Sequence, residues 1–356
     1  MSDDTEWIEI LPAPPRISSI IYNPIQDNDP GSGTKTYSID WDSRWTYNGG
    51  ALLTLRAYDD ENDNDVRDDF LAVDTVSVSV TNPTRNPDWT ETFESIGTLG
   101  GTSGGEFDGD WFVYKGGTNT WLATSAASHR GSKSAKFGPS GSGNYGANEF
   151  AQLYSPVHDC SSATRPYLRI WYKLDVEDSG RGDIAKILLV RYNGIDDIET
   201  PLAELRDDTT PAGTWIEQWF NLTGFKSSDF RINFLFDSDN DGNAGTGWFI
   251  DDYEIIDADP QIDDIADPSG ARGKTVIVNG ANFGSHQGSS TITFAKEGGG
   301  RTAPAISTWS NTGITVTVPD DAISGNVIVT VLGYDSNGEY FGVSLNPPTL
   351  GGLEQL

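Results

Sequence analysis

The segment from Asp237 to Asp252 reads DSDNDGNAGTGWFIDD, and the rest of the chain is best interpreted from it outward. It follows the apolar run Ile232–Phe236 and closes on a second apolar run, Trp248–Ile250. Short apolar runs bounded by glycine and aspartate are typical of buried β-strands. The segment therefore predicts two strands joined by a loop of carboxylates, an arrangement that calcium can stabilise.

The carboxylates of this loop have the spacing of calcium ligands. Asp237, Asp239 and Asp241 match the first half of an EF-hand loop, D-x-D-x-D-G. The match ends there, because the twelfth position needs a bidentate glutamate and is Trp248. We expect no helix–loop–helix hand and predict a calcium ion held by the three aspartates and a backbone carbonyl near Asn243. The alternative is a turn whose side chains bond to their own backbone.

The composition indicates several β-domains. The 356 residues suit two or three domains of the usual length of about 100–200 residues. With 40 glycines, 18 prolines, 15 Phe, 11 Trp and 13 Tyr, the chain favours short strands and turns. No long stretch has apolar residues at helical spacing, so helix should be scarce. We predict an all-β chain of three β-sandwich modules in tandem.

The charge balance excludes some partners. The 53 acidic and 23 basic residues give a formal charge of −30, which repels nucleic acid and anionic membranes. A solvated acidic surface and divalent-cation sites both explain such acidity. No apolar run approaches the roughly 18–20 residues that span a bilayer, so no membrane insertion is expected. No signal peptide precedes Asp3, and we expect a part of a longer, exported multidomain chain.

Residues 1–15 are rich in proline and are assigned to a linker, and residues 16–83 to a first domain. Its expected strands are Ile17–Tyr22, Lys35–Trp41, Ala51–Tyr58 and Val73–Thr81, the last with valines alternating against Ser and Thr. The final V-x-V-x-V-x-N pattern resembles the end of a bacterial immunoglobulin-like domain.

A second acidic segment separates the last two of these strands. Seven acids lie between residues 59 and 69 against one arginine, so the segment repels itself unless a cation binds. The candidate ligands are Asp59, Asp60, Asp63 and Asp65. The alternative is a solvated loop without metal.

Residues 89–257 are aromatic and glycine-rich and are assigned to one middle domain. The motifs that characterise it are Phe93-Glu94, Trp111, Trp121, Gly131–Ala135, Tyr145, Leu153–Val157, Leu168–Tyr172, Thr214-Trp215 and Gly247–Asp252. In this order they resemble the jelly-roll domain appended to secreted metallopeptidases of the immune inhibitor A type, which is similar to MAM domains and carbohydrate-binding jelly rolls.

The resemblance implies two packed antiparallel sheets in which the first and last strands are neighbours and share a structural calcium. The matching positions are Glu94 and Asp251 or Asp252. Carboxylates from both ends of the domain would suit a calcium ion, which takes six to eight oxygens. The alternative is that the two aspartates only end a strand.

Tryptophans on such a domain can stack on sugar rings, although most should belong to the core. The candidates for ligand contact are Trp111, Trp121, Trp215 and Trp219. They would serve a polysaccharide-binding site on the jelly roll.

Residues 260–345 resemble an IPT/TIG domain, an immunoglobulin-like module of receptors and bacterial surface proteins, and residues 346–356 form a tail. The pattern includes Gly273–Gly284, Trp309-Ser310, Ile314–Pro319 and Gly325–Val331. The glycines of the first motif are expected to shape turns and not to take part in chemistry.

The sequence offers little support for catalysis. His129, His158 and His286 lack the spacing of a zinc protease, and Cys160 beside His158 is better explained as a buried thiol. The G-x-S-x-G pattern at residues 101–105 lacks the helix that a nucleophile elbow needs.

We therefore expect a non-catalytic, calcium-stabilised accessory or adhesive region of a secreted or cell-surface bacterial protein, attached to a protease. Its partner would be a polysaccharide or a cell-surface protein. The alternatives are a carbohydrate-binding module and a glycan-active enzyme that uses paired carboxylates.

Overall fold

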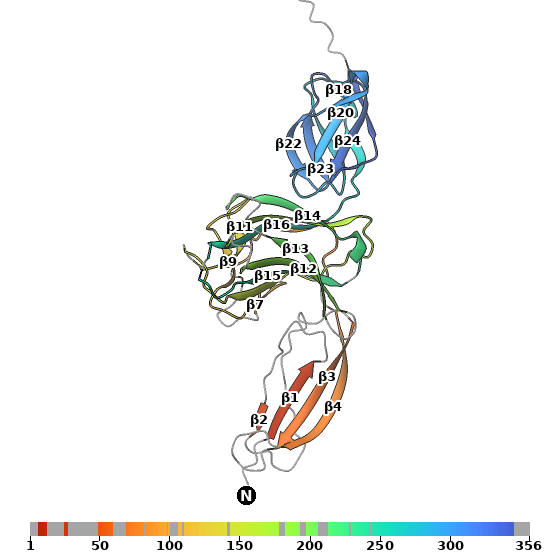
Figure 1. Ribbon diagram of the computed structural model, residues 1–356. Helices are drawn as coiled ribbons and strands as arrows, with labels where there is room; N and C mark the ends of the chain where they lie inside the picture. The colour runs from red at the N-terminus through yellow and green to blue at the C-terminus, as the bar shows by residue number, and fades with distance from the viewer. Residues whose placement is uncertain are drawn as a thin grey trace, which may run out of the picture.

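The computed structural model describes residues 6–12, 25–27, 49–59, 69–81 and 83–344. Within the last range, residues 98, 100–105, 109, 141–142, 178–181, 193–196, 206–212, 228 and 243 are not described. The chain forms β-rich bodies that follow one another in sequence order (Figure 1). In the described part, helix is limited to the 3-10 turns η3 (Thr223–Phe225) and η4 (Glu297–Gly299), which confirms the all-β prediction.

The N-terminal body is a four-stranded sheet in the order β2-β1-β3-β4. Its strands are β1 (Glu6–Pro12), β2 (Ile25–Asp27), β3 (Gly49–Asp59) and β4 (Asp69–Val80). Strands β3 and β4 confirm two of the expected strands, and the other two, at 17–22 and 35–41, lie outside the described residues.

Assigning residues 1–15 to a linker was wrong for the segment that forms β1. This strand pairs with β3 from Trp7, opposite Tyr58, to Pro12, opposite Leu53. The aromatic and β-branched residues of WIEI favour a strand, and the prolines that suggested a linker begin only where the strand ends.

The middle body contains strands β5 to β16 in two sheets. One has the order β13-β12-β15-β10-β7-β6, and the other has the order β14-β11-β16-β9-β8 with β5 added to β16. The bounds are β5 (Trp89–Glu91), β6 (Glu106–Asp108), β7 (Trp111–Lys115), β8 (Thr120–Thr124), β9 (Ser134–Gly138), β10 (Phe150–Tyr154), β11 (Pro166–Asp175), β12 (Ile184–Tyr192), β13 (Asp197–Leu205), β14 (Ile216–Asn221), β15 (Phe230–Asp237) and β16 (Gly247–Asp257).

The two strands that flank the carboxylate loop lie in different sheets. Strand β15 belongs to the first sheet and β16 to the second, so the loop crosses from one layer of the sandwich to the other. Strand β5 pairs with β16, with Trp89 opposite Ile255. The expectation that the first and last strands of this domain are neighbours is confirmed.

The core between the two sheets is aromatic. Trp111, Trp121 and Trp248 are 2%, 0% and 0% exposed, and Trp121 and Trp248 pack edge to face with ring centroids 5.2 Å apart. Trp111 and Trp121 were ligand candidates on sequence grounds. The structure corrects this, because rings inside the core are not available for stacking on a ligand.

The C-terminal body is a second sandwich. Its sheets have the orders β17-β19-β23-β22 and β18-β26-β24-β20-β21, and β25 pairs with β24. The bounds are β17 (Gln261–Ala266), β18 (Ser269–Ala271), β19 (Thr275–Ala281), β20 (Thr291–Lys296), β21 (Gly300–Thr302), β22 (Ala305–Ser310), β23 (Gly313–Thr317), β24 (Gly325–Val331), β25 (Tyr334–Asp335) and β26 (Glu339–Ser344). Alternating residues of β19 and β23, such as Val276 and Val316, fill its core.

The two sandwiches share a packed junction. Ile256, at the end of β16, and Ala258 belong to the C-terminal core, and Tyr167 and Trp219 of the middle body pack against it. Between the bodies, the fully buried Arg169 side chain contacts Glu217, Glu254 and the His286 carbonyl at 2.9, 3.4 and 3.0 Å. The described part of the chain contains no helix long and apolar enough to cross a bilayer.

Candidate functional site

The carboxylate loop between β15 and β16 is fixed by contacts from distant segments. The Asp239 amide donates to Asp183 Oδ1 at 3.1 Å, and the Thr246 amide donates to Asp175 Oδ2 at 3.0 Å. The Asp239 carbonyl accepts from the Asn148 amide at 2.7 Å. Both ends of the loop are therefore held by side chains near β11 and β12, which gives its carboxylates defined positions.

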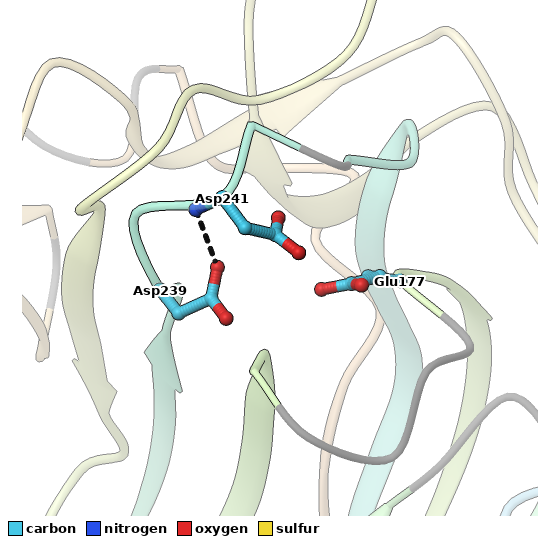
Figure 2. A group of neighbouring side chains, drawn as sticks. All are labelled: Glu177, Asp239 and Asp241. Atoms are coloured by element: carbon cyan, nitrogen blue, oxygen red, sulfur yellow. Dashed lines mark hydrogen bonds between the residues drawn. The ribbon is translucent and has the colours of Figure 1, made fainter.

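Three carboxylates meet at this loop. Oxygen atoms of Glu177, Asp239 and Asp241 all lie within 4.8 Å of one another. Figure 2 shows Asp239 and Asp241 extending from the loop toward Glu177, which follows β11. The Asp241 amide donates to Asp239 Oδ1 at 2.9 Å and fixes that carboxylate in place. Hard oxygen ligands at this spacing suit calcium.

The surroundings of the cluster are crowded with negative charge. Burial raises the pKa of Asp183, and the neighbouring carboxylates of Glu177 and Asp239 raise it further, against hydrogen bonds from Tyr145 and the Asp239 amide. A Cβ atom added at Gly182 would overlap the carboxylates of Asp239 and Glu177. The space beside Gly182 is therefore bounded directly by carboxylate oxygens.

The sequence found part of this cluster. Asp239 and Asp241 were predicted and are brought together, but Asp237 is exposed at the end of β15 and lies outside the group. Asn243 lies outside the described residues. Glu177 was missed, because it is 62 positions before Asp239 in the sequence and only the pairing of β11 with β16 places it beside the loop.

The second predicted calcium position has carboxylates that already accept hydrogen bonds. Glu94 accepts from the Ser132 hydroxyl at 2.7 Å and from the Ser132 and Lys133 amides at 2.6 and 2.8 Å, and these hydrogen bonds lower its pKa. Asp251 Oδ2 accepts from the His129 amide at 2.7 Å. Asp252 Oδ2 lies 2.6 Å from the His129 imidazole nitrogen Nδ1.

Glu94 and Asp252 nevertheless line one pocket of about 250 Å³, together with Arg130 and with Ser285 of the C-terminal body. Burial first, and the Asp252 carboxylate second, raise the pKa of Asp251 to about 7. The structure thus brings the two ends of the middle domain together, and calcium at this position stays a prediction.

The acidic segment of the N-terminal body lies almost entirely outside the described residues. Asp59 is the last residue of β3, where only the backbone is described. Asp60, Asp63 and Asp65 lie outside the described residues. The predicted calcium site at these positions stays a prediction.

The remaining tryptophan candidates lie on the outer face of the sheet that contains β11 and β14. Trp219 is half-buried: it packs against the C-terminal core, and the Arg169 guanidinium lies 4.8 Å from its ring centroid. Trp215 is half-buried, with its ring centroid 6.0 Å from that of His129. The sequence missed Trp171, which stacks on His129 at 3.6 Å between ring centroids.

The other sheet also carries apolar groups on its outer face. Leu153 and Phe234 point into the core, so their neighbours Tyr154 and Asn233 point to the opposite side. Phe112, Tyr154 and Leu188 form a separate cluster there. Asn233 is paired opposite Tyr154 and Leu188, is 0% exposed, and neither of its amide atoms has a hydrogen-bond partner.

Cys160 and His158 do not form a nucleophilic pair. Burial raises the pKa of the Cys160 thiol to about 12, so the thiol stays protonated. The His158 imidazole nitrogen Nε2 lies 2.7 Å from the Tyr253 hydroxyl. Cys160 is a buried thiol, as the sequence suggested.

Comparison with known families bears on the C-terminal body. Residues 260–346 match the family model of the IPT/TIG domain. The resemblance predicted for residues 260–345 is confirmed. The IPT/TIG domain packs against the middle body at the junction where Arg169 contacts Glu217, Glu254 and the His286 carbonyl. No curated protein sequence matches the chain.

The solved structures to which parts of the chain are similar include an adhesin domain and a carbohydrate-binding domain. One is the K1 cleaved adhesin domain of Lys-gingipain from Porphyromonas gingivalis W83, with 17% sequence identity and a TM-score of 0.35. The match covers 47% of this chain and 96% of the adhesin domain. Another is the CBM22-1 xylan-binding domain of Xyn10C from Paenibacillus barcinonensis, with 16% sequence identity and a TM-score of 0.29. The match covers 49% of this chain and 96% of the xylan-binding domain.

Proposed function

We propose that this chain is a non-catalytic, calcium-stabilised binding region. The observation that supports the calcium part is the group of three carboxylates, Glu177, Asp239 and Asp241, whose oxygens lie within 4.8 Å of one another. Calcium takes six to eight oxygen ligands, so loop carbonyls and water would complete the shell. The ion would join the loop between the sheets to the segment that follows β11.

We also propose that this region lies outside the cell and is an accessory or adhesive part of a longer bacterial protein that carries a protease. A net charge of −30 and a single cysteine are compatible with a secreted chain held together by core burial and calcium. The partner would be a polysaccharide or a cell-surface protein.

Thermal unfolding with and without a chelator tests the calcium part. A ligand that binds only the native state stabilises it by about 2.7 kcal/mol at a hundred times its Kd. We expect the chelator to lower Tm and calcium to restore it, with magnesium less effective because it demands octahedral geometry. An unchanged Tm after chelation would contradict the proposal.

A second candidate function is carbohydrate binding by the middle body. The observation that favours it is Asn233, whose amide is buried among Tyr154 and Leu188 on the outer face of its sheet with both polar atoms unpartnered. An unpaired buried polar group costs about 1–3 kcal/mol. Sugar hydroxyls both donate and accept, so they would satisfy this amide once the side chains that cover it move aside.

Retention on a panel of polysaccharides tests this candidate, with Asn233→Leu as the variant. We expect retention of the natural chain and loss in the variant, whose folding is checked by its melting curve. If no polysaccharide retains the natural chain, this function is excluded.

A further inference from the structure

One loop of the IPT/TIG domain lies directly on the buried ion network of the middle body. This GSHQG loop, Gly284–Gly288, connects β19 to β20. A Cβ atom added at Gly288 would overlap the guanidinium of Arg169 and the carboxylate of Glu217. A side chain at this position would push the loop off the middle body, so the glycine is what allows the loop to dock so closely.

Two hydrogen bonds attach the GSHQG loop to charged groups of the middle body. The Ser285 amide donates to Glu254 Oε1 at 2.8 Å, and Arg169 Nη1 donates to the His286 carbonyl at 3.0 Å. The side chains of Arg169 and Glu254 are both 0% exposed. Hydrogen bonds to ionised groups are stronger than neutral ones, so these two bonds hold the loop in its docked position.

The docked loop has no place for a charge on His286. The His286 side chain belongs to a residue that is 7% exposed, and its imidazole nitrogen Nδ1 lies 3.0 Å from the Ser285 hydroxyl. Its other nitrogen, Nε2, is buried and has no hydrogen-bond partner. A protonated imidazole donates from both nitrogens, so the added charge would be buried with one donor unsatisfied.

The charged groups around the loop offer no carboxylate to a protonated His286. Those of the middle body are His129, Arg130, Arg169, Glu217, Asp252 and Glu254.

Each of the three carboxylates is already engaged by another group. Arg169 contacts Glu217 and Glu254, and the His129 imidazole contacts Asp252. The ring centroids of His129 and His286 are 6.4 Å apart. Burial first, and then the nearby Arg169, Arg130 and His129, lower the pKa of His286. A proton on His286 would therefore add a positive charge beside other positive groups.

We propose that the GSHQG loop is an acid-sensitive latch, which releases from the middle body when His286 takes up a proton. Ile256 and Ala258 lie in the C-terminal core, and Tyr167 and Trp219 pack against it, so these contacts keep the two bodies joined after release. The IPT/TIG domain then changes its angle to the middle body without unfolding. The latch depends on neither the proposed calcium ion nor a carbohydrate.

The direction of the pH effect follows from the two positions of the loop. The docked loop excludes the proton, whereas a released loop exposes the imidazole to water, where a histidine titrates near about pH 6.5. Docking is therefore strongest above that pH. Below it, each pH unit shifts the balance between docked and released loop about tenfold toward release.

Glu254 titrates in the opposite sense. Burial raises its pKa, so the docked state takes up a proton on this carboxyl more readily than an exposed glutamate does, and acid favours docking through this group. Comparison of the natural chain with His286→Gln isolates the histidine, because Glu254 is present in both.

The test is amide hydrogen exchange of the full chain between about pH 6.5 and pH 4.5, corrected for the pH dependence of intrinsic exchange. We expect protection of the GSHQG loop to fall about 100-fold more in the natural chain than in His286→Gln. The matched control Gln287→Ala changes the same loop but keeps the histidine, so it should behave like the natural chain. Protection of β24 should stay constant, since the domain remains folded.

The outcomes decide the proposal. No loss of loop protection in the natural chain, or an equal loss in His286→Gln, overturns it. A parallel loss in β24 would mean that acid unfolds the domain, which also overturns the latch.

If His286→Gln fails to dock at any pH, imidazole NMR of the natural chain decides instead, because the chain has only three histidines. His286 should become charged in step with the loss of loop protection. A charged His286 in a loop that stays protected would contradict the proposal.

Discussion

Strands β11 and β16 run between two groups of acids, one that contacts a buried guanidinium and one whose carboxylates approach one another. At one end, Arg169 lies fully buried between Glu217 and Glu254 at the junction with the IPT/TIG domain. At the other end, Glu177 and the loop aspartates bring three carboxylates within 4.8 Å. The same pair of strands therefore connects a buried ion network to a crowded acidic cluster.

At the junction the protein supplies its own cation, and at the cluster we propose that a bound ion has this role. A buried carboxylate is stable beside a guanidinium and costly alone. Two like charges about 4 Å apart repel by about 4 kcal/mol at an effective dielectric constant of 20, and by less where water screens them. The junction already contains its cation, whereas the cluster would gain stability from the calcium ion that we propose for it.

Removing the junction's cation should have the largest effect. Arg169→Met leaves the carboxylate of Glu254, which is 0% exposed, without a neighbouring cation, so the free energy of unfolding should fall by about 3–5 kcal/mol. Urea unfolding of the full chain measures this. A loss below about 1 kcal/mol would show that Arg169 does not hold the junction together.

Blocking the cluster without removing a carboxylate should have the next largest effect. In Gly182→Ala the added methyl group overlaps Asp239 and Glu177, so the calcium-dependent rise in stability, about 2.7 kcal/mol at a hundred times Kd, should shrink or vanish. Melting with and without calcium measures it. Gly224→Ala, where an added Cβ meets no atom within 4 Å, is the control. A full calcium response in Gly182→Ala would contradict the assignment.

The junction should also contribute to acid sensitivity. Burial, and then the nearby Arg169, lower the pKa of His286 to about 2, whereas an unfolded histidine titrates near about 6.5. The unfolded state therefore binds the extra proton first as pH falls. Stability is fully present above about pH 6.5 and declines below it by about 1.4 kcal/mol per pH unit for this group.

The variant His286→Gln should remove this part of the slope. Urea unfolding between about pH 6.5 and pH 4.5 measures it. His158 also has a pKa lowered to about 3 by burial, so a second slope of the same sign should remain. An unchanged slope in His286→Gln would show that the histidine does not titrate on unfolding.

The smallest effect is expected for an exposed ion pair at the same junction. Arg165 and Asp259 are 38% and 31% exposed and lie 2.6 Å apart. Solvent screens such pairs, so Arg165→Met should cost about 0–1 kcal/mol. Urea unfolding beside Arg169→Met makes the comparison direct. Equal losses in the two variants would contradict the distinction between buried and exposed charges at this junction.

Local patterns in the sequence predicted what depends on local chemistry. Alternation identified β4, apolar runs identified β15 and β16, and the glycine-rich motifs of the IPT/TIG domain located its sandwich. The WIEI segment could have identified β1, but the following prolines received more weight. Burial of Trp111 and Trp121 was not predictable residue by residue, because an aromatic strand residue can face either side of its sheet.

The cluster was only half predictable for a topological reason. Asp239 and Asp241 are two residues apart, and their spacing is visible in the sequence. Glu177 joins them because β11 and β16 are paired, with Asp175 opposite Gly247. Long-range pairing has no short sequence signature, and an acid after an aromatic strand was the only available sign.

Calorimetric calcium titration of Asp239→Asn and Asp237→Asn tests the central claim most directly. Both residues were predicted as ligands, both lie in the same loop, and only Asp239 belongs to the cluster. We predict that the natural chain and Asp237→Asn bind calcium with similar affinity and that Asp239→Asn loses this binding. Equal binding by both variants, or no binding by the natural chain, would contradict the account.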